Sequence, residues 1–124
     1  MIAVDSSTLI AFFQGDRGSD VDTLVAALRV GDVVLPPVVL VEILSQPGIP
    51  DTVRNLIVEL PRLDLTSDYW LRAAALRSII LGRRLRARLP DTLIAQSCID
   101  ADVPLVARAG DFRHFAKHCG LKLL

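Results

Sequence analysis

The chain opens with the stretch Met1-Ile2-Ala3-Val4-Asp5-Ser6-Ser7-Thr8, in which a short apolar run stops at an acid that is followed by three hydroxyl residues. A short apolar run is typical of a buried strand, and Asp, Ser and Thr are residues that commonly begin helices. We therefore predict a strand over residues 1–4 that turns directly into a helix. Asp5 lies at the carboxyl end of this strand, where functional groups gather in parallel α/β sheets.

The same alternation of short apolar segments and helix patterns continues along the chain. We predict further strands over residues 33–35, 62–65, 104–106 and 121–124. We predict helices from Ser19 or Asp20 to Gly31, after Pro37, over 50–60, from 67 to about 85 with Thr66 or Ser67 as the cap, over 90–100 and over 111–118. Short strands that alternate with helices indicate a parallel sheet covered on both faces. The prediction is one three-layer α/β domain over residues 1–124, with a central parallel sheet flanked by helices.

Length and composition favour a small soluble protein. With 124 residues the chain is long enough for one domain and too short for two. Apolar residues make up 52%, which argues against disorder, yet no apolar run free of charge approaches the roughly 18 to 20 residues of a membrane span. The first residues do not resemble an export signal, and Cys98 and Cys119 lack the spacing of a metal or redox motif. We expect a cytoplasmic protein with reduced thiols and no membrane partner.

The high apolar content also bears on self-association. A domain this small has more apolar surface than one core can bury, so we predict a homodimer. We expect Trp70 and the Phe12-Phe13 pair to serve as core or dimer contacts rather than as a platform on which bases stack.

Four acids interrupt or adjoin apolar runs: Asp5, Glu42, Asp91 and Asp111. The predicted elements place them so that they can converge at one edge of the sheet. Carboxylates that lie this near one another raise one another's pKa and repel unless a cation neutralises them. A set of ligands made only of oxygen suits Mg²⁺ or Mn²⁺ rather than zinc. The chemistry that this implies is the attack of metal-activated water on a phosphodiester.

Each of these acids also has a purely structural interpretation. Asp5 and Asp111 can cap the helices that follow them, and Asp91 suits the first turn of a helix because of the helix dipole. Glu42 is harder to explain in this way, because it sits inside a seven-residue apolar run and a buried charge is rarely left unpaired. Glu42 therefore favours the functional interpretation most strongly.

Arginines gather just before Asp91. The chain as a whole has 14 basic and 14 acidic residues, which gives no general reason to expect a polyanion partner. The segment from Tyr69 to Pro90, however, contains six arginines and no acid. Arginine pairs with phosphate through two hydrogen bonds, so we expect five arginines to contact RNA; the alternative is an ordinary solvated surface. Four of these candidates lie in this segment, Arg83, Arg84, Arg86 and Arg88, and Arg108 is a similar candidate farther along the chain.

Residues beside the acids can orient them. Ser7 and Thr92 lie one or two positions from a predicted ligand and could hold a carboxylate or a bound water in place. Helix capping is the alternative, and for Thr92 it is the favoured one. His114 and His118 have the i, i+4 spacing of a metal pair, but no third ligand is evident, and we assign them to the dipole at the end of their helix.

Taken in order, the four acids and their contexts resemble the motifs of the PIN-domain family. The first motif is Ile2-Ala3-Val4-Asp5-Ser6-Ser7, and the second is Pro37-Val38-Val39-Leu40-Val41-Glu42-Ile43. The third is Leu89-Pro90-Asp91-Thr92-Leu93-Ile94-Ala95-Gln96, and the fourth is Leu105-Val106-Ala107-Arg108-Ala109-Gly110-Asp111-Phe112. The resemblance extends over essentially the whole chain.

The resemblance implies a function as well as a fold. It implies an endoribonuclease that uses Mg²⁺ or Mn²⁺ held by Asp5, Glu42 and Asp91, with Asp111 assisting, and that leaves a 5′-phosphate and a 3′-hydroxyl. It further implies the toxin of a VapC-like toxin–antitoxin pair, whose partners are RNA, a cognate antitoxin protein and a second copy of the chain.

The fourth motif departs from the family pattern. Ala107 and Ala109 stand where the family usually has a hydroxyl residue and an acidic or amide residue. This departure keeps open an alternative function, a catalytically weakened PIN-fold module that binds RNA or protein. A flavodoxin-like receiver domain fits less well, because it would need two adjacent acids after the first strand and Asp5 stands alone.

Overall fold

A computed structural model describes residues 1–108 and 110–124. Three parallel strands form the central sheet: β1 (Ile2–Val4), β2 (Val33–Val34) and β3 (Leu105–Val106). The strand order is β2-β1-β3, and Ala3 pairs with Val34 on one side and with Leu105 on the other. Because β1 is central, both of its neighbours bring their carboxyl ends to the end where Asp5 follows.

The outer edges of the sheet are less regular than the sequence predicts. The segments over 62–65 and 121–124 contribute only isolated parallel bridges, between Leu35 and Arg62 and between Leu105 and Leu123. In the first segment Leu63 packs against the core while its neighbours are exposed, and in the second only Leu121 is buried. With one apolar side chain to bury, each segment has little to hold a longer pairing in place.

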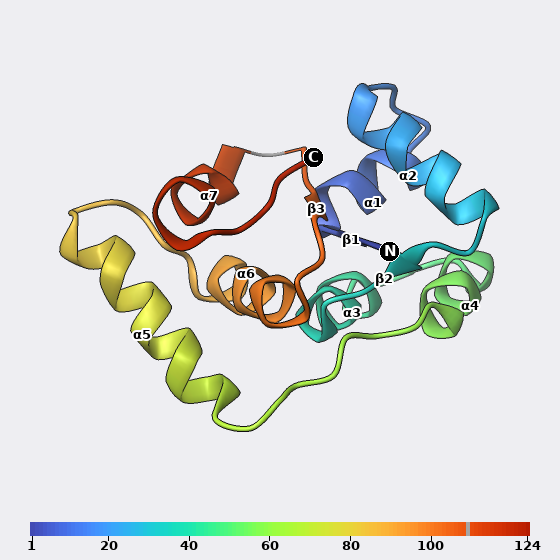
Figure 1. Cartoon of the computed structure of the whole chain (residues 1–124). Coiled ribbons are helices and arrows are strands. Elements are labelled where there is room, and N and C mark those ends of the chain that lie inside the picture. The colour runs from blue at the N-terminus through green and yellow to red at the C-terminus, as the bar shows by residue number, and fades with distance from the viewer. Residues whose placement is uncertain (109) are drawn as a thin grey trace.

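Seven α-helices and one 3₁₀ turn surround the strands in the described residues. They are α1 (Ser6–Phe13), α2 (Ser19–Arg29), α3 (Pro37–Leu44), α4 (Asp51–Glu59), α5 (Tyr69–Gly82), α6 (Leu89–Ala101), the 3₁₀ turn η1 (Gly110–Phe112) and α7 (Arg113–Cys119). Figure 1 shows α5, α6 and α7 gathered on one side of the strands, and α1, α2 and α4 on the other. The predicted three-layer α/β fold is confirmed.

Helix α5 begins later and ends earlier than predicted. Asp68 precedes it with a left-handed backbone (φ 61°), and neither Thr66 nor Ser67 caps the helix. Both instead accept hydrogen bonds from the Arg72 guanidinium, Thr66 through its hydroxyl and Ser67 through its carbonyl. The helix starts at Tyr69, and Thr66 and Ser67 bind its first turn through Arg72.

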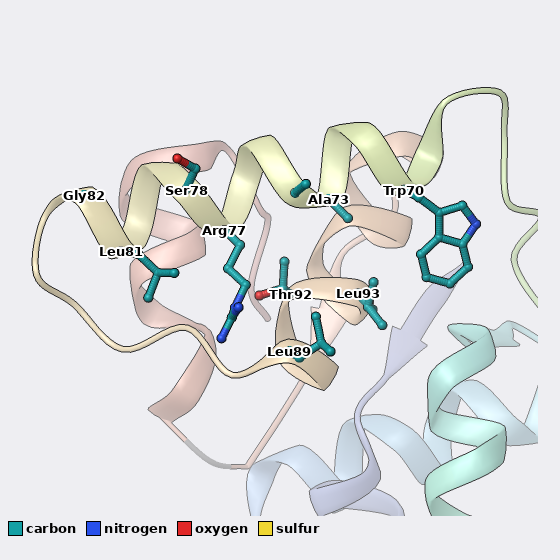
Figure 2. Close-up of a pocket in the computed structure, with 10 residues that line it drawn as sticks. Trp70, Ala73, Arg77, Ser78, Leu81, Gly82, Leu89, Thr92 and Leu93 are labelled. Carbon is teal, nitrogen blue, oxygen red and sulfur yellow. The ribbon is translucent and has the colours of Figure 1, made fainter.

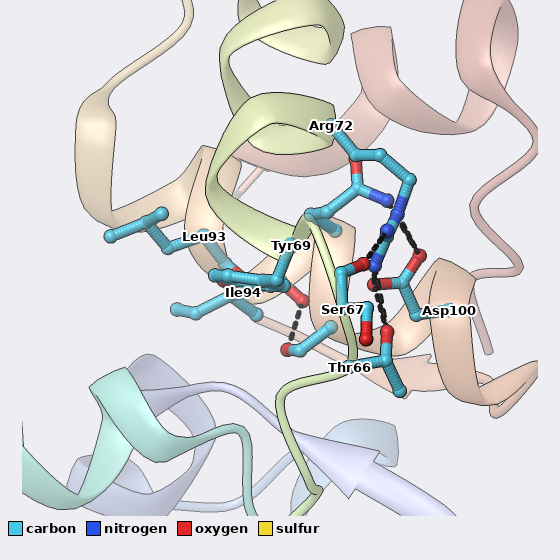
Figure 3. A network of polar contacts seen from close by, with 9 residues as sticks. Thr66, Ser67, Tyr69, Arg72, Leu93, Ile94 and Asp100 are labelled. Carbon is cyan, nitrogen blue, oxygen red and sulfur yellow. Dashed lines mark hydrogen bonds and ion pairs between the residues drawn. The ribbon is translucent and has the colours of Figure 1, made fainter.

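A polar network holds α5 on α6 (Figure 3). Arg72 forms a fork with Asp100, with Nη2 2.6 Å from Oδ2 and Nε 3.2 Å from Oδ1. This pair lowers the pKa of the Asp100 carboxyl. The Tyr69 hydroxyl donates to the Leu93 carbonyl at 2.6 Å, and burial followed by the charge of Asp100 raises the Tyr69 pKa to about 12. The network fixes which face of α5 meets α6 and which face is left to solvent.

The core lies between the sheet and the helices. Phe112 and Phe115, at 1% and 0% exposure, pack with their ring centroids 6.4 Å apart and anchor the segment that carries Asp111. Cys98 and Cys119 are free, and burial raises the pKa of the Cys98 thiol to about 12, as expected of a structural cysteine. None of the helices in residues 1–108 and 110–124 is both long and apolar enough to cross a bilayer.

Candidate functional site

The four predicted acids are carried by elements that meet at the carboxyl ends of the strands. Asp5 follows β1, Glu42 lies on α3, Asp91 lies in the first turn of α6 and Asp111 lies in η1. Burial, then the charges of Asp111 and Asp5, raise the pKa of Asp91 to about 6; the charge of Glu42 adds to the rise, and Arg88 opposes it. The fold therefore brings all four carboxylates into one electrostatic group.

Asp5 caps helix α1, and its carboxylate is also held by the Ser7 hydroxyl. It is 5% exposed and caps α1, as the structural interpretation predicts. Its Oδ2 also accepts a short hydrogen bond of 2.6 Å from the Ser7 hydroxyl. Capping and orientation of the carboxylate are thus compatible, because both use Ser7 in the first turn of α1.

Glu42 carries an unsatisfied oxygen. Its Oε1 is buried and has no hydrogen-bond partner among the described residues. Burial, then the charge of Asp5, raises the pKa of the Glu42 carboxyl, and Ser6 opposes the rise. A buried carboxylate oxygen without a partner is costly unless a cation or a proton satisfies it. This oxygen is the observation that best fits a bound metal ion.

The donor set suits a hard divalent cation in its chemistry. All four candidate ligands are carboxylates, the type that Mg²⁺ and Mn²⁺ prefer. Within the described chain, however, no three acidic, histidine or cysteine side chains stand close enough to enclose an ion as they are placed. The carboxylates therefore interact through charge without forming a closed cage.

A polar cavity of about 310 Å³ opens beside two of the acids. Its lining residues are Arg86, Arg88, Asp91, Gly110, Asp111, Arg113 and His114. Of the five arginines predicted to contact RNA, two therefore line this cavity. Arg83 instead caps the end of α5 beside His118, and Arg84 lies in the following loop with a positive φ of 60°.

Arg113 is a cavity residue that the sequence analysis missed. A Cβ on Gly110 would lie 3.3 Å from Arg113 Nη1, so the glycine leaves room for the guanidinium against the backbone. Its position in the sequence could have indicated it, because Arg113 comes two residues after Asp111, at the start of α7. His114, which we assigned with His118 to the dipole at the end of the helix, instead lies in the first turn of α7 and lines the cavity, whereas His118 lies in the last turn.

Thr92 and Arg108 make contacts within the protein other than those that the sequence predicts. The Thr92 hydroxyl donates to the Arg88 carbonyl at 2.8 Å and makes no hydrogen bond to an acid among the described residues, so the structure does not support an orienting role for it. The Arg108 guanidinium is bound to Asp20 and to the Arg17 carbonyl through Nε and Nη2, so it is held by the protein rather than free. Of the two alanines in the fourth motif, Ala107 is half-buried, and Ala109 lies outside the described residues.

A second, larger hollow lies between α5 and α6 (Figure 2). It has a volume of about 700 Å³ and is lined mainly by apolar side chains, among them Trp70, Leu81, Leu89 and Leu93. Arg77 is its one charged lining residue in the described chain, and its Nε donates to the Ala87 carbonyl. Trp70 is 63% exposed, so it is not a core residue. The Phe12 and Phe13 rings, by contrast, pack partly buried against the core.

Comparisons with known proteins agree with this architecture. The family model of the PIN domain matches residues 2–118, whereas no curated protein matches at a significant level. One chain of a crystal structure of VapBC2 from Rickettsia felis, bound to a DNA fragment from their promoter, is similar with a TM-score of 0.74. The likeness covers 100% of this chain and 98% of that one at 16% identity, which supports the fold alone. Because the family model spans nearly the whole chain, this protein belongs to the PIN-domain family.

Proposed function

We propose that this protein is an endoribonuclease in which Asp5, Glu42 and Asp91 hold Mg²⁺ or Mn²⁺ and Asp111 assists. The observation that carries the proposal is the buried, unpartnered Oε1 of Glu42 within a group of acids that raises the pKa of Asp91 to about 6. When bound, the ion would neutralise this group and activate water for attack on a phosphodiester.

The residues of the chain support two further parts of the chemistry. The Ser7 hydroxyl holds the Asp5 carboxylate in one orientation, as residues behind a metal ligand commonly do. Arg86, Arg88 and Arg113 line the cavity next to Asp91, where an RNA backbone would otherwise be repelled by the acids. Arginines in this position can pair with the phosphates that flank the bond to be cut.

The biological role that we propose is that of a VapC-like toxin controlled by a cognate antitoxin protein in the cytoplasm. Membership of the PIN-domain family and the likeness to a chain of the VapBC2 complex support this role. We also propose that the chain forms a homodimer. The exposed apolar side chains of the hollow between α5 and α6, with Trp70 at one end, supply a surface that a second copy could cover.

The two glutamates of the chain provide a matched test of the nuclease. Glu42→Gln removes the charge of the unpartnered carboxylate, whereas Glu59→Gln makes the same change at an exposed position at the end of α4. We expect Glu42→Gln to lower Mn²⁺-dependent cleavage of a short RNA more than about a hundredfold, since even residues that only orient a ligand are worth about ten- to a hundredfold. Glu59→Gln should cut at the wild-type rate.

Calorimetric titration with Mn²⁺ separates the nuclease from the alternative of a binding module. A nuclease should bind Mn²⁺, and chelation with EDTA should stop cleavage by the wild type. If the wild type binds RNA without cutting it and takes up no Mn²⁺, the nuclease proposal is wrong and the binding module replaces it. Equal activity of the two glutamine variants would also contradict the assignment of Glu42.

A further inference from the structure

Two residues outside the carboxylate group tie the loop after β3 to the start of α2. We propose that Asp20 and Arg108 are positioning residues for Asp5: their ion pair holds the Arg108 main-chain N–H against Ser7, and Ser7 in turn orients the Asp5 carboxylate. The inference rests on the proposed function insofar as Asp5 is a metal ligand. It gives Arg108 a role different from the RNA contact that the sequence suggested.

The Arg108 guanidinium binds Asp20 through two of its nitrogens. Its Nε lies 3.0 Å from Asp20 Oδ2, its Nη2 lies 3.2 Å from Asp20 Oδ1, and the same Nη2 donates to the Arg17 carbonyl at 2.8 Å. The hydroxyl of fully buried Thr8 adds a hydrogen bond of 3.0 Å to Asp20 Oδ2. Burial works to raise the pKa of Asp20, but the hydrogen bonds from Arg108, Thr8 and the Val21 main chain, together with the charge of Arg108, outweigh it, and the pKa lies below its ordinary value. Asp20 therefore stays charged and holds Arg108 in one place.

A chain of hydrogen bonds continues from Arg108 to the proposed metal ligand. The Arg108 main-chain N–H donates to Ser7 Oγ at 3.2 Å, and Ser7 Oγ donates to Asp5 Oδ2 at 2.6 Å. A serine hydroxyl has a single hydrogen, so accepting from Arg108 leaves that hydrogen free to point at Asp5. Ala107 offers no polar side chain next to this contact. The main chain of Arg108 is thus the link between this loop and Ser7.

Gly18 makes room for the pair. A Cβ at this position would lie 2.5 Å from Asp20 Oδ1 and 2.8 Å from Arg108 Nη2. Any side chain at residue 18 must therefore displace one partner. Gly18→Ala is a way to disturb the pair without changing either of its charged residues.

The chain contains a matched control for the loss of such a pair. Arg72 and Asp100 form the same kind of fork between α5 and α6, and their side chains are 38% and 13% exposed. The corresponding values for Arg108 and Asp20 are 38% and 14%. The hydrogen bonds of Arg72 and Asp100 lead to Thr66, Ser67 and Gln96 rather than to the four acids. Breaking either pair should cost similar stability, and only one should affect the metal ligand.

The experiment compares Asp20→Asn with Asp100→Asn in the full chain. We expect both variants to lower the melting temperature of the metal-free protein by a similar amount. Asp20→Asn and Gly18→Ala should weaken Mn²⁺ binding, measured by calorimetry, about tenfold or more, the usual effect of residues behind a ligand. Asp100→Asn should leave the Mn²⁺ affinity unchanged. An unchanged affinity in Asp20→Asn, or an equal loss in Asp100→Asn, would overturn the proposal.

Hydrogen exchange in metal-free protein tests the positioning step separately from the nuclease proposal. The Arg108 amide should exchange faster in Asp20→Asn than in the wild type, and at the wild-type rate in Asp100→Asn. If the wild type binds no Mn²⁺ yet this exchange pattern is observed, the proposed function fails while the positioning of Ser7 stands. If the exchange of the Arg108 amide is the same in all three proteins, the positioning itself is refuted.

Discussion

The two hollows of this molecule differ in both size and chemistry. The hollow between α5 and α6 holds about 700 Å³ and is lined mainly by apolar side chains, whereas the cavity at the sheet edge holds about 310 Å³ and is lined by three arginines, a histidine, two aspartates and a glycine. Among the described residues, no acid or histidine that could activate water lines the larger hollow, and its one charged residue, Arg77, donates a hydrogen bond to the Ala87 carbonyl. The smaller one adjoins coupled acids, so convergent charge rather than volume marks the candidate site.

Helix α6 separates these two environments within a single turn. Asp91 faces the polar cavity, while Leu89, Thr92 and Leu93 line the apolar hollow (Figure 2). Successive residues of a helix point about 100° apart, so one short segment can serve two surfaces. Under the proposed function, the hollow would serve association and the cavity would serve chemistry, so substitutions on the two sides should separate these functions.

The largest effect that we expect in this comparison is on association. Trp70→Ala removes the large exposed side chain of the apolar hollow, and an aromatic anchor of a dimer contributes about 2 kcal/mol or more. The dimer dissociation constant should therefore rise about thirtyfold, measured by light scattering or sedimentation over a range of concentrations. Val30→Ala, at a position that is 75% exposed and remote from the hollow, is the control. A wild type that is monomeric at micromolar concentration would contradict the homodimer.

The next effect should appear on the polar side. Reversing the charge of Arg86 and Arg88 together should lower RNA affinity about tenfold or more and flatten its dependence on salt by about 0.7 per lost phosphate contact. Different RNA sequences should be affected about equally, because the contacts are to phosphate. The same double change at Arg83 and Arg84, which do not line the cavity, is the matched control. If the two double variants lose RNA affinity equally, the cavity has no special role in RNA binding.

The sequence predicts the central strand and the positions of the acids better than it predicts the edges of the sheet. The strand over residues 1–4 and the acids at Asp5, Glu42 and Asp91 could be placed because each acid adjoins a short, strongly apolar run. Leu63 and Leu121 could not be assigned correctly, because single buried leucines look like strands in a sequence and form only bridges in the fold.

Contacts between distant residues were beyond the reach of the sequence. Nothing in the sequence indicates that Arg108 pairs with Asp20, 88 positions away, so this arginine within the fourth motif was predicted to contact RNA. Thr92 could be seen to adjoin Asp91, but only the helix geometry shows that its hydroxyl turns back to the Arg88 carbonyl. Sequence proximity to a ligand therefore does not predict contact with it.

The smallest expected effect is on the free energy of unfolding. It distinguishes a site where acids are held charged at a cost from an ordinary surface. The pKa of Asp91 is raised from 3.8 to about 6, so the folded protein binds this proton more tightly than the unfolded chain does. The resulting cost is fully present above pH 6, decreases as the pH falls toward 4 and disappears below that. This rise in pKa would correspond to about 3 kcal/mol, but Asp91 is only half-buried, and solvent screening reduces the expected cost to about 1 kcal/mol.

In EDTA, Asp91→Asn should therefore be more stable than the wild type by about 1 kcal/mol at pH 7 and equally stable at pH 4 in urea denaturation. Trp70→Ala should show no such dependence on pH, because no titrating acid lines the apolar hollow in the described chain. A stability difference between Asp91→Asn and the wild type that stays constant from pH 7 to pH 4 would show that the acids do not repel one another in the folded protein, and the contrast between the two hollows would then lose its electrostatic basis.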